Sequence, residues 1–354
     1  VPVDEAARGA FGDRMLSMLN EALTGLLVSL GHQAGLFDTM NAIGPATSTG
    51  LAASATCNER YVREWLGGLT VAGVVRHDPA DDTYRLPPEH AAWLTSDAGP
   101  DNLARLLGFV PMLAEVEQDI LTCLRRGGGL SYDKYPRFHA FMDADSRATI
   151  DHTLLDAVVP LVPELRERLR AGIDVADIGC GSGHAINVLA REYPDSRLVG
   201  YDFSEEAVTR ARAEAARLGL DNARFEQRDV AALDTPGRFD LVTAFDAIHD
   251  QAFPARVLSE VSRALKPGGT FLMVDIKASS NVDDNVENPF APSFYAFSVF
   301  HCMSVSLGLG GAGLGTVWGR QLATSMLHEA GFGHVDIQEI EGDPFNDYYV
   351  CTPA

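Results

Sequence analysis

The stretch Val175-Ala-Asp-Ile-Gly-Cys-Gly-Ser-Gly-His184 decides the fold of this chain. Its apolar start, Val175–Ile178, is typical of a buried strand, and glycines then stand at every second position. Glycine lets the chain turn sharply and lets the backbone lie close to a ligand. The following run, His184–Tyr193, has helical spacing, so its free N–H groups and positive dipole end face the space over the turn. The stretch predicts a nucleotide-type site at the carboxyl edge of a parallel sheet.

Strand and helix patterns alternate from Ile173 to the C-terminus. Further strands are predicted at Arg197–Tyr201, Ala223–Gln227, Leu241–Phe245, Phe271–Asp275, Val335–Glu339 and Tyr348–Cys351. Further helices are predicted at Glu205–Leu218, Pro254–Leu265 and Gly319–Ala330. This order predicts a doubly wound α/β sheet, with a hairpin at the end because few residues separate the last two strands.

The N-terminal part predicts an all-α, winged-helix domain. A helix over residues 13–31 carries an apolar stripe at Leu16, Leu19, Leu23, Leu26 and Leu30, which fits packing within its own domain and a dimer seam equally well. Helices at 48–55 and 59–71 and short strands at 74–77 and 83–86 follow. Residues 1–100 hold six Arg, no Lys and twelve Asp or Glu. Because DNA affinity depends on phosphate contacts, this domain is interpreted as an assembly module.

Residues 101–170 are predicted to be mainly helical, with an aromatic-rich segment at Tyr132–Phe138 that fits either core or a pocket wall. The predicted domains are therefore a winged-helix and dimerisation domain (1–100), a helical connector and pocket lid (101–170) and a nucleotide-binding domain (171–354). The glycine-rich run Ser306–Gly315 is expected to be a mobile lid or a disordered loop.

Composition narrows the class of partner. The net charge of −21 disfavours nucleic acid and anionic membranes as partners. Five scattered cysteines without a CxxC pair favour free thiols in a reducing compartment, and predict no disulfide and no metal site. The 354 residues contain no apolar run of membrane-spanning length and no N-terminal signal pattern, so the expected location is cytoplasmic.

Two further acids stand at predicted strand ends. Asp202 follows the glycines by about twenty residues, where a carboxylate can accept both ribose hydroxyls. Asp229 is placed to accept from an adenine amino group, with Phe203 and Val230 as flanking walls. A dinucleotide fingerprint would need glycine at position 184, where this chain has His184.

Asp177-x-Gly-x-Gly-x-Gly183, Asp202, Asp229 and Leu265-Lys-Pro-Gly-Gly269, in this order, resemble the class I S-adenosylmethionine-dependent methyltransferases over residues 170–354. With its N-terminal part, the chain is similar to two-domain bacterial, particularly mycobacterial, methyltransferases with a winged helix. The resemblance implies a Rossmann-like sheet of seven strands with the last antiparallel. It also implies S-adenosylmethionine as cofactor and S-adenosylhomocysteine as product.

The resemblance also implies roles for individual residues. The methionine end of the cofactor would be held by Asp177 and the turn, Asp202 would bind the ribose, and Asp229 would bind the adenine. The full set implied for the cofactor is Asp177, Gly179, Cys180, Gly181, Gly183, Asp202, Phe203, Asp229, Val230 and Phe245.

The segment Phe245-Asp-Ala-Ile-His-Asp-Gln251 resembles small-molecule O-methyltransferases that place His-Asp after the same strand. His249 is predicted to be the general base, with Asp250 beside it, because histidine titrates near neutral pH. Those enzymes continue with Trp where this chain has Gln251, and a role in supporting the loop is the alternative. The predicted substrate pocket is Tyr132, Tyr135, Phe138, Met142, Phe297 and His301.

The predicted function is a homodimeric methyltransferase that acts on a small, rather apolar acceptor with a hydroxyl group. The alternatives are a winged-helix DNA-binding regulator with S-adenosylmethionine as effector, or a methyltransferase acting on protein or RNA.

Overall fold

The computed structural model describes residues 2–354, apart from the side chains at positions 139, 140, 145 and 148. The chain forms two compact units, Val1–Ala114 and Glu115–Ala354, which are described one at a time below. The helical stretch predicted over residues 101–170 is divided between them.

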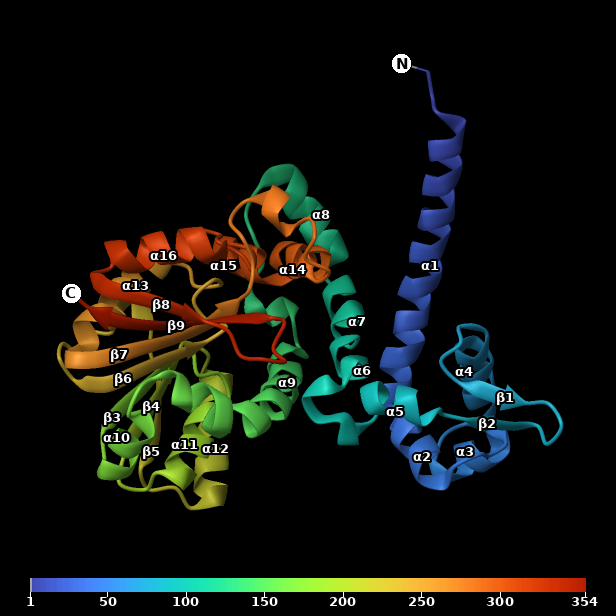
Figure 1. Ribbon diagram of the computed structural model, residues 1–354, viewed down its shortest axis with the longest axis horizontal. Coiled ribbons are helices and arrows are strands. Elements are labelled where there is room, and N and C mark those ends of the chain that lie inside the picture. The colour runs from blue at the N-terminus through green and yellow to red at the C-terminus, as the bar shows by residue number, and fades with distance from the viewer. Residues whose placement is uncertain (1) are drawn as a thin grey trace. The chain divides into compact units, whose positions relative to one another are not determined.

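The first unit is a winged helix preceded by a long helix (Figure 1). Its elements are α1 (Glu5–Gln33), α2 (Leu36–Ile43), α3 (Ser48–Ser54), α4 (Glu59–Val71), β1 (Arg76–Asp78), β2 (Thr83–Arg85), α5 (Pro88–Leu94), α6 (Leu103–Leu106) and α7 (Phe109–Ala114). The predicted helix-turn-helix with a hairpin wing is confirmed. Helix α1 begins earlier than predicted because the Asp4 side chain accepts hydrogen bonds from the main-chain N–H groups of Ala6 and Ala7.

The core of this unit forms around Trp65 on α4. Its indole N–H donates to the main-chain oxygen of Leu27 on α1 at 2.8 Å, and its ring lies 5.2 Å from that of Phe37. A Cβ at position 31 would lie 2.4 Å from the Trp65 ring, so Gly31 lets α1 and α4 approach closely.

The second unit is built on a seven-stranded sheet with the order β5-β4-β3-β6-β7-β9-β8. The strands are β3 (Asp174–Ile178), β4 (Arg197–Asp202), β5 (Ala223–Gln227), β6 (Phe239–Phe245), β7 (Leu265–Ile276), β8 (Phe332–Gln338) and β9 (Asn346–Pro353). The first five are parallel, and β9 runs antiparallel to both β7 and β8. The predicted α/β sheet with an antiparallel last strand is confirmed.

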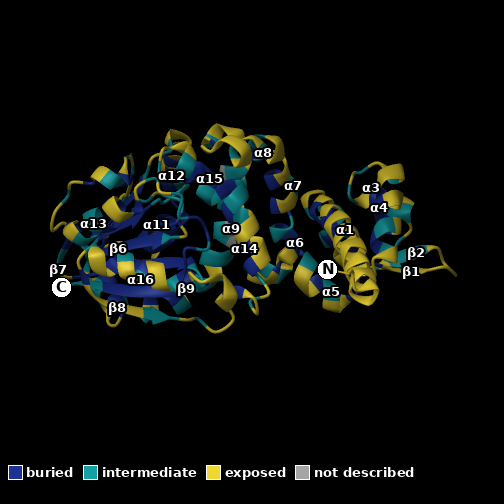
Figure 2. Cartoon of the chain, turned by 90° about the horizontal axis from the view of Figure 1, so that it is seen from above, coloured by how far each residue is buried: buried dark blue, intermediate teal, exposed yellow. Residues whose placement is uncertain are grey.

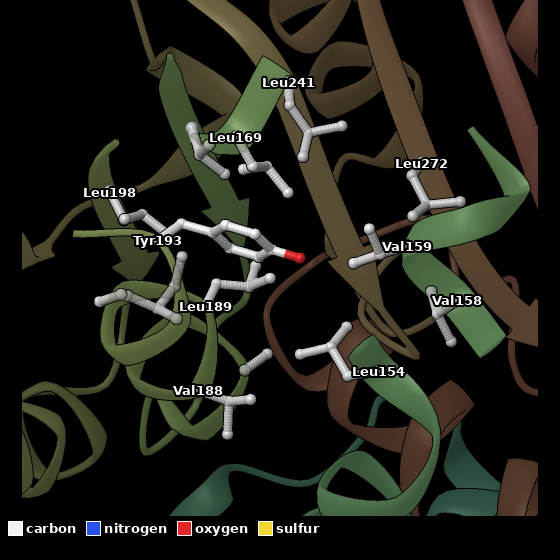
Figure 3. Close-up of a cluster of buried hydrophobic side chains, with 14 of the residues drawn as sticks. Leu154, Val158, Val159, Leu169, Val188, Leu189, Tyr193, Leu198, Leu241 and Leu272 are labelled. Atoms are coloured by element: carbon white, nitrogen blue, oxygen red, sulfur yellow. The ribbon is translucent and has the colours of Figure 1, made fainter. Parts of the chain in front are cut away.

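The helices of the second unit are α8 (Glu117–Arg126), α9 (Phe138–Thr153), α10 (Leu165–Ala171), α11 (His184–Glu192), α12 (Glu205–Leu218), α13 (Pro254–Ala264), α14 (Ala291–Phe297), α15 (Met303–Gly308) and α16 (Gly319–Glu329). Helices α10, α11 and α12 cover one face of the sheet, and α13 and α16 cover the other. Neighbouring strand residues point to opposite faces, so Leu272 joins the core with α10 and α11 while Met273 joins the core with α13 and α16. Figure 2 shows the buried strands, and Figure 3 shows the first of these cores around Tyr193.

In the part of the chain that the structure describes, no helix is long and apolar enough to cross a membrane. The five cysteines are all free thiols.

Candidate active site

The glycine turn joins β3 to α11, and Gly179, Gly181 and Gly183 have left-handed φ angles of 67°, 52° and 74°. A Cβ on Gly179 would lie 2.6 Å from the Cβ of Ala247, and a Cβ on Gly183 would lie 2.3 Å from the Phe225 ring. Both positions therefore require glycine for conformation and for packing. A Cβ on Gly181 would meet no described atom within 4 Å, so this part of the turn borders open space.

Two acids at the ends of β3 and β4 surround this turn. Asp177 is 3% exposed and accepts a hydrogen bond from Thr243 Oγ1 at 2.7 Å. Burial raises the pKa of Asp177 to about 7, against the Thr243 hydrogen bond and with a contribution from the nearby Asp202 carboxylate. Asp202 accepts from the main-chain N–H groups of Gly181 at 2.9 Å and Ser204 at 2.8 Å. Asp202 and the turn are thereby fixed relative to each other.

The other residues predicted for the cofactor lie at the same edge of the sheet. Asp229 follows β5, is exposed, and accepts from the main-chain N–H of Ala231 at 2.9 Å. Val230 beside it is buried, and Phe203 after β4 is 42% exposed. Cys180 in the turn and Phe245 at the end of β6 are half-buried.

Helix α9 makes polar contacts with the turn and the start of α11. Ser182 Oγ donates to the Asp143 carboxylate, and His184 Nε2 lies 2.8 Å from Asp151 Oδ1. The sequence analysis assigned Phe138 and Met142 of this helix to a pocket but did not identify its acids as partners of the turn. Their sequence pattern gives no signal for these contacts, because it does not indicate which element α9 covers.

The loop after β6 carries His249, which is 4% exposed. Its Nδ1 lies 2.8 Å from Asp275 Oδ1, and this oxygen also accepts from Trp318 Nε1 at 2.9 Å and from the main-chain N–H of Ile276 at 2.9 Å. Burial lowers the pKa of His249, but the Asp275 carboxylate, together with Cys302, raises it well above its usual range. Asp275 itself is fully buried at the end of β7.

Asp250, although it follows His249 in the chain, is hydrogen-bonded to Tyr132. Its Oδ2 accepts from the Tyr132 hydroxyl at 3.0 Å, whereas among the described residues the acidic partner of the His249 ring is Asp275. Burial raises the pKa of Asp250 to about 6, partly offset by His249 and Tyr132. The sequence analysis missed Asp275 as a site residue, although its place at a strand end was a usable signal.

The aromatic residues predicted for the substrate pocket pack on one another. The Phe138 and His301 rings stack with centroids 3.9 Å apart, and Tyr135 lies 4.8 Å from His301. Tyr132 lies 5.2 Å from Phe203, which joins this cluster to the residues near the glycine turn. Two further predicted pocket residues are half-buried, namely Met142 on α9 and Phe297 on α14.

The acids of the site do not form a metal centre. Across the described residues, no group of three or more His, Cys, Asp or Glu is placed to hold a metal ion. Their hydrogen bonds go to hydroxyl, imidazole, indole and main-chain N–H groups instead.

Because the folded-state pKa of Asp177 is raised, the folded protein holds this proton more tightly than the unfolded chain. The resulting stability is present below about pH 4 and is lost as pH rises to about 7. Asp177→Asn cannot take up this proton but keeps an acceptor for Thr243, so its stability should not fall over this pH range. Relative to the wild type, its unfolding free energy should therefore be roughly 4 kcal/mol more favourable above pH 8 than at pH 4. Urea unfolding at both pH values measures this. Asp195→Asn, at an exposed acid, is the control, and an equal gain there would contradict the assignment.

Comparisons with known proteins give two family matches. Residues 22–96 match an Rv2258c-like winged HTH domain, and residues 169–331 match a methyltransferase domain. Trans-aconitate 2-methyltransferase of Deinococcus radiodurans is 32% identical over 143 residues, which are 40% of this chain and 48% of that protein. The chain thus spans about half the length of the curated relatives that it matches.

Solved structures show the same fold over nearly the whole chain. Mitomycin 7-O-methyltransferase has a TM-score of 0.71 at 18% identity, covering 99% of this chain and 100% of that one. Human N-acetylserotonin methyltransferase, solved with S-adenosylmethionine, has a TM-score of 0.70 at 15% identity and covers 99% of each chain. The chain therefore combines a stretch that matches an Rv2258c-like winged HTH domain with a stretch that matches a methyltransferase domain.

Proposed function

We propose that this protein transfers the methyl group of S-adenosylmethionine to a hydroxyl oxygen of a small, rather apolar acceptor, with His249 as general base. The observation that carries the proposal is the buried contact between His249, on the loop that touches the glycine turn, and Asp275 at the end of β7. The loop and the glycine turn are in close contact, because a Cβ on Gly179 would stand 2.6 Å from the Cβ of Ala247. A base on this loop is therefore near the place where the methyl donor would bind.

The residues around the turn suit this cofactor. Gly181 leaves space above the turn, and main-chain N–H groups hold both oxygens of Asp202. Since a carboxylate offers about four acceptor positions, the fixed Asp202 would take the ribose hydroxyls. Asp229 would take the adenine amino group, and Asp177 with the turn would hold the methionine end. When bound, the cofactor supplies an electrophilic methyl group on a sulfonium.

His249 would remove the acceptor's hydroxyl proton at Nε2. Its Nδ1 faces Asp275, so the N–H at that nitrogen donates to the carboxylate and leaves Nε2 as the proton acceptor. Asp275 would stabilise the imidazolium that forms. The aromatic cluster around Tyr132 and His301 favours an apolar acceptor.

A DNA-binding regulator is the second candidate, favoured by the winged-helix match. The charges of α4 oppose it, because Arg60 pairs with Glu64 and Arg63 pairs with Glu59 on the same helix. Phosphate contacts would have to compete with these pairs. We therefore propose that the winged helix serves assembly.

Assembly would use α1, whose predicted apolar stripe faces outward within the first unit (Figure 2). Its large exposed apolar side chains are Phe11, Met15, Leu16, Met18, Leu19, Leu23, Leu26 and Leu30. A contiguous exposed apolar surface of this kind marks a protein interface. We propose that a second copy of the chain covers it to form a homodimer.

Cofactor binding tests the proposed function most simply. Calorimetry should detect binding of both S-adenosylmethionine and S-adenosylhomocysteine, and Asp202→Ala should weaken it about 10- to 100-fold by removing charge-assisted hydrogen bonds. Asp195→Ala, which removes an exposed acid elsewhere, should bind as the wild type does. A wild-type protein that binds neither compound would refute the proposal.

Turnover measurements test the role of His249 as general base. With labelled S-adenosylmethionine and a panel of small phenols, His249→Ala should lower kcat about 10²- to 10⁴-fold without weakening cofactor binding. Because the pKa of His249 is raised, the rate should increase with pH along a limb that lies above pH 6.5. Asp275→Asn should move this limb to lower pH, since it removes the neighbouring negative charge. Unchanged turnover in His249→Ala would exclude the base role.

Sedimentation velocity tests the dimer. The wild type should sediment as a species of twice the 38.1 kDa chain mass. The double variant Leu19→Glu, Leu23→Glu should sediment as a monomer, because it places two charges in the exposed apolar surface of α1. Leu124→Glu, at a leucine that is 78% exposed on α8, is the matched control. A double variant that remains dimeric would place the interface elsewhere.

A further inference from the structure

The glycine-rich segment 306–318 packs against the loop that carries His249. The main-chain N–H of Ala312 donates to the oxygen of Ala252 at 2.9 Å, and that of Gly315 donates to the oxygen of His249 itself at 3.2 Å. The sequence predicts a mobile lid or a disordered loop at Ser306–Gly315. In the structure, the backbone of this run is hydrogen-bonded to the loop of the proposed base.

Ser306 on α15 links the segment to the loop at a second place. Its side chain is fully buried, its Oγ donates to the main-chain oxygen of Gln251 at 2.8 Å, and the same Oγ accepts from the N–H of Gly313 at 3.0 Å. One hydroxyl therefore bonds to both backbones. Its removal would leave a buried donor and a buried acceptor without this partner.

Two glycines of the segment lie where the chain is closely packed. A Cβ on Gly311 would lie 2.4 Å from the Cα of Ala252, and a Cβ on Gly315 would lie 2.1 Å from Ser298 Oγ. Gly315 also has a φ of 73°, which side chains with a Cβ rarely adopt. Glycine therefore permits tight packing against the His249 loop at position 311 and against Ser298 at position 315.

Trp318 ends the segment and reaches the acid of the pair. Its ring is 3% exposed, and its Nε1 donates to the Asp275 oxygen that also faces His249 Nδ1. The segment therefore contacts the loop backbone at one end and the orienting carboxylate at the other.

We propose that segment 306–318 is a brace that holds His249 in position for proton transfer, with Ser306 and Trp318 as its positioning residues. The proposal rests on the proposed function, in which His249 is the base. Groups that orient a catalytic side chain fix its geometry to within fractions of an ångström, and a displacement of 1 Å can cost 10²-fold in rate. Neither residue touches the acceptor or the cofactor in this role.

The indole N–H has a second, measurable effect. It shares the negative charge of Asp275 with the imidazole, and so weakens the attraction between the carboxylate and a protonated His249. Replacing Trp318 by Phe keeps the aromatic volume but removes the donor. The pKa of His249 should then rise further, because the Asp275 carboxylate no longer shares its negative charge with the indole N–H.

Hydrogen exchange tests the Ser306 contact. Ser306→Ala should speed amide exchange about tenfold in peptides covering 309–315 and 249–252, since their shared hydrogen-bond partner is lost. Ser304→Ala is the matched control, because Ser304 is also buried on α15 but its Oγ donates to Val299 at 2.8 Å, away from the loop. In turnover, Ser306→Ala should lower kcat about tenfold with unchanged cofactor affinity. Equal exchange in the two variants would overturn the brace.

NMR titration of the ring of His249, in protein labelled at histidine and without cofactor, tests the Trp318 contact independently of activity. Trp318→Phe should move the midpoint to higher pH, and Trp93→Phe, at a tryptophan that is 50% exposed on α5, should not. A midpoint unchanged by Trp318→Phe would overturn this role of Trp318. If His249→Ala retained turnover, the base role would fail, while the exchange and titration results would still decide the brace.

Discussion

The buried hydrogen bond between His249 and Asp275 is the interaction on which the rest of the site depends. Both groups are almost completely removed from water, and a charged group in such a place is costly unless it is paired and hydrogen-bonded. The pair stabilises the imidazolium and fixes the ring orientation at the same time. Trp318 and the main-chain N–H of Ile276 hold the carboxylate in turn, so a chain of hydrogen bonds orients the histidine.

Sheet topology brings this pair beside the glycine turn. Strand β3 lies between β4 and β6, and β6 lies beside β7, so their carboxyl ends share one edge. The turn after β3 and the loop after β6 meet at Gly179 and Ala247. In sheets of this kind, ligands bind outside the carboxyl ends of the strands, where the connections diverge to opposite sides. A methyl donor over the turn and a base on the loop would therefore face the same space.

Sequence reasoning predicted the features that are local in the chain. Strand periodicity located all seven strands, and the glycine spacing with Asp202 indicated the nucleotide-type site. The sequence indicated Asp250, the neighbour of His249 in the chain, as the second catalytic residue. It did not indicate Asp275, because only the pairing of β6 with β7 brings that carboxylate to the His249 ring. The composition of Ser306–Gly315 predicts a mobile lid or a disordered loop because glycine permits motion. Glycine also permits close packing, and composition cannot distinguish the two until the neighbour, Ala252, is known.

The most direct test of the central claim is a crystal structure of the protein with S-adenosylhomocysteine. The account predicts that the sulfur lies above the turn at Gly179–Gly183, with His249 Nε2 facing it across a space for one acceptor oxygen. His249 should remain bonded to Asp275 through Nδ1. A sulfur on the far side of the turn from His249, or an imidazole that has lost its Nδ1 contact with Asp275 and turned away from the sulfur, would contradict the account.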